Sequence, residues 1–202
     1  YVERATRIAI YARNTEAASE TAALWVELDP LNPDAHQVLA VMSLRKGEIE
    51  KSLEHLETIL ENSHGKIDQK LWMIANMLGR EKDRDIVMQV MEKLLLNHQG
   101  DPEAMYAFAH VAARIGELDR AVELLQATLE LAPENDNAAM SYISILQKQG
   151  RINEALEWME KVLPTRESND FNLRSAYARL LTDAKRFDDS RRQFEILSVQ
   201  AP

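Results

Sequence analysis

Apolar residues recur three and four positions apart along nearly the whole chain. The segment 118–131 is a clear example, with apolar side chains at Leu118, Ala121, Val122, Leu125 and Leu129. This spacing places them on one face of an α-helix and leaves the charged residues on the opposite face. Because β-branched residues dominate no segment, the pattern predicts an all-α protein built from amphipathic helices.

The helical pattern itself repeats every 34 or 35 residues. Gly116 and Gly150 lie 34 positions apart, as do Ala121 and Ala155. A period of this length is typical of stacked repeats, each a pair of helices that buries its apolar face against its neighbours. We therefore expect one array over residues 1–202, with units at about 1–32, 33–67, 68–101, 102–135, 136–170 and 171–202. The first unit opens in helical period without a cap, and the last stops where another unit would begin, so we expect the chain to be a fragment of a longer protein.

Turn residues and small residues mark each unit. Gly47, Gly116 and Gly150 fall where the first helix of a pair should end, a place that favours a left-handed residue. The unit 68–101 departs from this plan, with Lys82 at the turn and Gly79 placed inside its first helix. Small side chains recur where two helices should approach closely, at Ala40, Ala75, Ala109 and Ala178 in first helices and at Ala18, Ser52, Ala121, Ala155 and Ser190 in second helices.

These features resemble the tetratricopeptide repeat over essentially the whole chain. The resemblance depends on Gly116, Ala121, Leu125 and Pro133, on their counterparts Gly150, Ala155 and Met159, and on weaker copies around Ser52 and Ser190. It implies a right-handed α-solenoid superhelix of about six antiparallel helix pairs. It also implies that the first helix of each pair lines the concave side, and that the protein binds other proteins rather than catalysing a reaction.

Composition narrows the functional classes. The net charge of −9 disfavours nucleic acid as the main partner, and no apolar run approaches the ~20 residues of a membrane-spanning helix. Cysteine is absent, which excludes disulfides, cysteine-based zinc sites and thiol nucleophiles. The closest two of the six glycines are fourteen positions apart, which excludes glycine-rich phosphate-binding motifs. None of the five histidines forms a zinc-binding motif with a neighbour. We therefore expect no enzymatic activity, no cofactor and no metal.

The candidate binding residues are those that recur in register along the expected concave side. A row of cations lies near the end of successive first helices. A polar row lies one helical turn before it, and an apolar row lies two turns before it. The cationic row is Arg45, Arg80, Arg114 and Lys148; the polar row is Asn76, His110 and Ser144; the apolar row is Trp72, Tyr106 and Met140. Cations beside exposed aromatic rings suit a peptide that carries acidic groups or a free carboxylate.

Simpler explanations exist for both rows. A cation in the last turn of a helix is stabilised by the helix dipole by about 0.3–1 kcal/mol, and Trp72 and Tyr106 could pack between neighbouring units. Some tetratricopeptide proteins clamp a chaperone's C-terminal carboxylate with a Lys and an Asn one turn apart and a later Lys–Arg pair. Here Asn76 and Arg80 lie one turn apart, but the Lys–Asn pair and the later Lys–Arg pair are missing. We therefore do not predict that this chain binds the C-terminus of a chaperone.

The sequence thus predicts a non-catalytic scaffold that holds a partner protein or peptide in its groove. A structural spacer or self-association module, and the regulatory arm of a larger enzyme assembly, remain alternatives. The opening units, with "WVELDPLNPDAHQVLA", look like the bacterial envelope lipoproteins that carry long tetratricopeptide arrays. That resemblance favours the periplasm or outer membrane over the cytoplasm, but the fragment itself does not fix the compartment.

Overall fold

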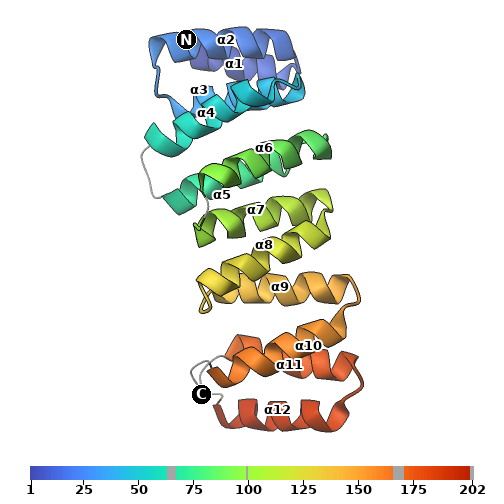
Figure 1. Ribbon diagram of the computed structural model, residues 1–202. Helices are drawn as coiled ribbons and strands as arrows, with labels where there is room; N and C mark the ends of the chain where they lie inside the picture. Colours follow the sequence, from blue (N-terminus) through green and yellow to red (C-terminus); the bar gives the residue numbers. More distant parts are fainter. Residues whose placement is uncertain (63–66, 99, 166–170, 201–202) are drawn as a thin grey trace. The chain divides into compact units, whose positions relative to one another are not determined.

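A computed structural model describes residues 1–62, 67–98, 100–165 and 171–200, and every regular element in these ranges is helical (Figure 1). The helices are α1 Val2–Tyr11, α2 Thr15–Leu28, α3 Pro33–Arg45, α4 Ile49–Asn62, α5 Ile67–Leu78, α6 Arg84–Asn97, α7 Pro102–Ile115, α8 Leu118–Leu131, α9 Asp136–Lys148, α10 Ile152–Val162, α11 Phe171–Asp183 and α12 Phe187–Gln200, with a short 3-10 turn at Leu163–Thr165. The predicted all-α class and the six helix pairs are confirmed. The unit ends expected at 170 and 202 lie outside the described residues.

Side-chain caps begin several of the helices, as the Asn, Asp and Pro signals indicate. Asn32 accepts a hydrogen bond from the backbone N–H of Ala35 at 3.1 Å, and Pro33 occupies the first turn of α3. Asn135 caps α9 in the same way through the N–H of Ala138 at 3.0 Å. Each cap satisfies a backbone donor that the helix itself leaves unpaired, which fixes where the helix starts.

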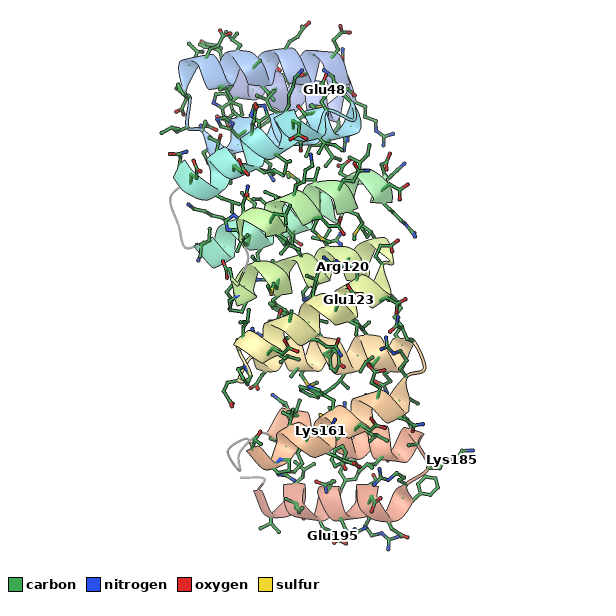
Figure 2. The ribbon with its side chains drawn as sticks, viewed as in Figure 1. Glu48, Arg120, Glu123, Lys161, Lys185 and Glu195 are labelled. Carbon is green, nitrogen blue, oxygen red and sulfur yellow. The ribbon has the colours of Figure 1, made fainter. Side chains whose placement is uncertain are left out.

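Among the described residues, the turns of five of the six helix pairs contain a left-handed residue, and the turn between α5 and α6 contains none. Gly47, Gly116 and Gly150 have φ values of 75°, 93° and 74°. Two corresponding turns have a side chain there instead, since Arg13 and Lys185 adopt φ values of 56° and 61°. Figure 2 shows Lys185 at the turn between α11 and α12. The backbone conformation of this turn therefore persists even where glycine has been replaced.

The small residues of the second helices are buried. Ala18, Ala121 and Ala155 are fully or almost fully buried. Where serine takes the same place, its hydroxyl donates to a carbonyl of the facing helix: Ser52 bonds the carbonyl of Ala40 at 3.0 Å. Ser190 donates to the carbonyl of Ala178 at 2.8 Å. A larger side chain at these positions would separate the paired helices, so the small residues set the distance between them.

The chain divides into two compact units, residues 1–115 and 116–202. In the first unit, α3 packs against α4 and α2, α5 packs against α7, and α4 packs against α6. In the second, α8 packs against α9 and α11 against α12. No helix in the described ranges is long and apolar enough to cross a membrane.

Candidate functional site

The first unit contains a hollow of about 730 Å³ beside the first helices of its opening pairs. We call it the α3–α5 groove, because α3 and α5 supply most of its walls. Its lining comprises Ile10 of α1; Gln37, Val38, Val41, Met42 and Arg45 of α3; Met73, Asn76 and Met77 of α5; and Arg80 and Glu81 just beyond α5. The volume lies within the range of about 300–1,000 Å³ typical of ligand pockets. The first helices thus supply most of the lining of this hollow, as the resemblance to the tetratricopeptide repeat implied.

A second hollow of about 670 Å³ adjoins the groove at its charged end. The two share four residues, Ile10, Arg45, Arg80 and Glu81. The second hollow is lined in addition by Arg13, Thr15, Leu44, Lys82, Asp83 and Ile86. One end of the groove is therefore apolar and the other is rich in charged side chains.

Arg45 and Glu81 form a two-point ion pair at this charged end. Nε and Nη2 of Arg45 each donate to one carboxylate oxygen of Glu81, both at 2.8 Å. These hydrogen bonds raise the pKa of Arg45 above its ordinary value, mainly through the bonds themselves and less through charge attraction. The pair links the end of α3 to the residue that follows α5, and it neutralises a cation that the sequence suggested was available for a partner.

Arg80 is a cation of this end that stays available. It is exposed, and its guanidinium makes no hydrogen bond or ion pair with the part of the chain that the structure describes, while its backbone N–H donates to the carbonyl of Met77 at 3.2 Å. Arg13 and Lys82 are exposed as well. The carboxylate of Asp83 accepts a hydrogen bond from the N–H of Ile86 at 3.1 Å as the cap of α6. The charged end therefore has an excess of positive charge.

Arg114 of α7 reaches α5 across a glycine. Its Nη1 donates to Oδ1 of Asn76 at 3.4 Å. A Cβ atom added to Gly79 would lie 3.0 Å from Cδ of Arg114, so the missing side chain leaves room for the arginine stem. Gly79 lies just after α5, which ends at Leu78, and the expectation that it falls inside the helix is wrong. Its role is close packing, because its φ is not positive.

An aromatic cluster of Trp72, Tyr106 and His110 joins α5 to α7. The ring centroids lie 5.4 Å apart for Trp72–Tyr106 and 4.7 Å apart for Trp72–His110, both edge to face. The side chain of Tyr106 is only 8% exposed, so the expectation that its ring is free for a partner is wrong. Trp72 is half-buried. Ring stacking between neighbouring pairs explains why these residues recur 34 positions apart.

Burial lowers the pKa of His110 below its ordinary value, and the positive charge of Arg114 adds to this effect. The imidazole of His110 is therefore neutral near pH 7, and its Nε2 lies 3.3 Å from the hydroxyl of Tyr106. The neutral ring of His110 therefore packs against its two aromatic neighbours. The positive charge of this region comes from the arginines.

The remaining candidates belong to the second unit. Met140 and Ser144 are exposed on α9, and Lys148 is exposed at its last residue. Met140 shows 37% of its surface. They occupy the same places on α9 that Trp72, Asn76 and Arg80 occupy on or just after α5 in the repeat register. The continuation of the three rows from the first unit into the second stays a prediction.

Sequence reasoning missed most of the apolar lining of the groove. Ile10, Met42, Met73 and Met77 stand one position away from the rows followed in the sequence. The pair Met73 and Met77, four apart and flanking Asn76, was an available signal, because methionines at helical spacing next to a polar groove residue indicate an adaptable surface. Glu81 gave no such signal, since its partner Arg45 lies 36 positions away.

Comparison with known proteins agrees with the paired helices. Residues 112–180 match the family model described as tetratricopeptide repeat. A TPR repeat-containing protein of Pseudomonas aeruginosa, PA4667, is 28% identical over 185 residues, which cover 87% of this chain and 29% of that protein. A TPR repeat-containing protein of Methanocaldococcus jannaschii, MJ1428, is 25% identical over 164 residues, covering 77% of this chain and 29% of that protein. The chain thus spans less than a third of the length of either relative.

Among solved structures, MamA AMB-1 has a TM-score of 0.51 and 16% sequence identity. The match covers 82% of this chain and 90% of that one. At this identity the likeness concerns the fold alone. Residues 112–180 thus match the tetratricopeptide repeat model, and the chain is similar over most of its length to two TPR repeat-containing proteins.

Proposed function

We propose that this chain is a protein-binding scaffold whose α3–α5 groove holds a segment of a partner protein that carries acidic groups. The tetratricopeptide fold supports the general role of interaction scaffold. The groove adds a specific surface, because it is hollow, lined by first helices and apolar at one end. The observation that carries the proposal is Arg80, an exposed cation without a partner among the described residues, at the rim of that hollow.

The ion pair of Arg45 and Glu81 supports the same surface in a different way. Because Glu81 already accepts hydrogen bonds from Nε and Nη2 of Arg45, an incoming carboxylate meets less competition at Arg80 than at Arg45. Arg114 is likewise engaged, with Asn76 and against Gly79. Among the three arginines of the cationic row in this unit, Arg80 is therefore the one we assign to partner contact.

The charge change Arg80→Glu tests this proposal. A matched control is Arg84→Glu, since Arg84 is also exposed and lies outside both hollows. The protein and both variants are used to capture partners from cells of its source, and the retained proteins are quantified by mass spectrometry. We expect Arg80→Glu to lose a set of proteins that the wild type and Arg84→Glu keep, because a glutamate at this rim repels acidic groups.

Equal retention of every captured protein by Arg80→Glu, at low salt, would contradict the groove as the binding surface. Circular dichroism of both variants is needed beside the capture. Arg80 lies beyond the last residue of α5, so its replacement should leave the helix content unchanged.

A further inference from the structure

The apolar end of the α3–α5 groove has a composition that the cationic row does not explain. Three methionines line it, together with aliphatic side chains. We call this surface the methionine floor, defined by Ile10, Val41, Met42, Met73 and Met77. A surface of this kind makes no hydrogen bonds, so it cannot position an acidic group.

The floor combines buried and accessible side chains. Met42 and Met77 are 5% and 8% exposed and form its fixed part. Val41 and Met73 are half-buried, and Ile10 is 43% exposed. Covering the accessible part with an apolar side chain of a partner would remove this surface from water, which is favourable in proportion to the area buried.

Methionine side chains adapt their shape to what they contact, because they are unbranched and have three rotatable bonds. Met73, the accessible methionine of the floor, can therefore adjust to a leucine, a methionine or a phenylalanine. This tolerance contrasts with Arg80, whose guanidinium demands a carboxylate or another anion. The groove thus selects for an anion at Arg80 and tolerates different apolar side chains at the methionine floor.

Met73 lies on α5, and Arg80 lies two positions beyond Leu78, where that helix ends. Seven helical positions rise about 10 Å, which gives the order of magnitude of the separation along the chain. An extended peptide covers that distance in about three residues. The separation is short enough for one segment to occupy both points at once.

We infer that the partner segment is an acidic peptide with an apolar anchor, in which one large apolar side chain lies on the methionine floor and a carboxylate about 10 Å away pairs with Arg80. This inference rests on the groove being the binding surface, as proposed above. Charge complementarity favours this occupant, because Arg13, Arg80 and Lys82 surround the end where the carboxylate would lie. Asp83 there already caps a helix.

A displayed library of random sixteen-residue peptides tests the inference. The wild-type protein selects binders, and the enriched consensus is synthesised for affinity measurements. We expect the consensus to contain an apolar residue and an Asp or Glu at constant spacing. Enrichment of peptides that lack either feature, or no enrichment at all, would overturn the inference.

Two groove variants and two controls then locate the binding. Met73→Gln places a polar group of similar length on the floor, and Met88→Gln makes the same change on α6 at a half-buried methionine outside both hollows. Arg80→Glu and Arg84→Glu form the second pair. We expect each groove variant to weaken binding of the consensus peptide about tenfold or more, and each control to change it less than about twofold.

The pattern of losses separates this inference from the proposed function. If Arg80→Glu weakens binding and Met73→Gln does not, the apolar anchor is wrong and the groove still binds. If neither does, the groove itself is not the binding surface. A peptide in which the consensus acid is replaced by lysine should regain affinity for Arg80→Glu, and failure of this exchange would show that the carboxylate does not pair with Arg80.

Discussion

At the scale of single residues, the left-handed backbone conformation of a turn is kept even where the residue is not glycine. Gly150 and Lys185 hold equivalent turns, with φ values of 74° and 61°. The left-handed region brings a Cβ atom close to the following carbonyl, a cost that glycine avoids. The turn before α12 bears that cost, and the surrounding helix pair maintains the conformation.

Replacing Lys185 by glycine should therefore stabilise the protein. We expect a gain of about 0.5–1 kcal/mol in the free energy of unfolding, since relief of strain exceeds the added flexibility of the unfolded chain. Urea denaturation followed by circular dichroism measures it. The reverse change, Gly150→Lys, should destabilise by a similar amount, because an added Cβ there meets nothing within 4 Å and the backbone alone decides. Destabilisation by Lys185→Gly would show that Lys185 makes a contact worth more than its strain.

At the scale of helices, a pair of histidines joins α3 to α4. Nδ1 of His36 lies 3.0 Å from Nδ1 of His55, and Nε2 of His36 lies 2.8 Å from the carbonyl oxygen of Pro30. A carbonyl can only accept, so Nε2 of His36 carries a proton and donates it. In the neutral ring Nδ1 of His36 is then the acceptor, and Nδ1–H of His55 is the donor.

This arrangement makes the stability of the first unit depend on pH. Burial lowers the pKa of His55, the charge of His36 lowers it further, and Glu54 acts in the opposite direction. The unfolded chain then binds a proton before the folded chain does, so stability is complete above the ordinary histidine pKa of about 6.5 and falls as the pH drops through it. Denaturation curves between pH 8 and pH 5.5 should show this loss.

His55→Gln is the matched variant for that measurement. It removes the titrating ring and should lower the stability at pH 8 by about 1 kcal/mol through the lost hydrogen bond. Its pH dependence should be shallower than that of the wild type. Parallel curves for the two proteins would mean that the histidine pair does not govern the acid sensitivity.

At the scale of the whole molecule, the division into two compact units suggests that damage in one is felt mainly there. Repeat proteins gain stability from interactions within and between neighbouring repeats. Ala155→Leu in the second unit inserts a large side chain at a fully buried position and should cost about 1–3 kcal/mol. Glu157→Leu, at an exposed position of the same helix α10, should change stability far less.

Hydrogen exchange under native conditions reveals where that cost appears. For Ala155→Leu we expect faster exchange at amides of α10 and its neighbour α11, with the protection of α3 and α4 unchanged. A uniform acceleration over both units would show that the chain opens as one cooperative body, contrary to this expectation.

The fold was largely predictable from sequence because its determinants are local. Caps such as Asn32, glycines such as Gly116 and small residues such as Ala121 each act within one helix pair, and a period of 34 displays them repeatedly. The candidate site was less predictable. The register suggested Arg45, Arg80 and Arg114 as equivalent residues, and it could not show that two of them are already engaged.

Contacts between distant positions account for that difference. The bond from Arg45 to Glu81 spans 36 residues, and the close approach of Arg114 to Gly79 spans 35. Such contacts depend on how neighbouring repeats are offset, and no periodic pattern encodes an offset. The methionine floor was missed for a related reason, since it lies beside the repeated rows and has no counterpart in each unit.

The aromatic cluster beside the groove has an optical consequence. A protonated imidazole quenches the emission of an adjacent indole, and the ring of His110 lies 4.7 Å from that of Trp72. Asn76, which lines the groove, donates to the carbonyl of Trp72 at 2.9 Å. Trp72 is thus a built-in fluorophore next to the binding surface. Its emission should decrease when His110 takes up a proton, which burial shifts to a pH below the ordinary histidine pKa.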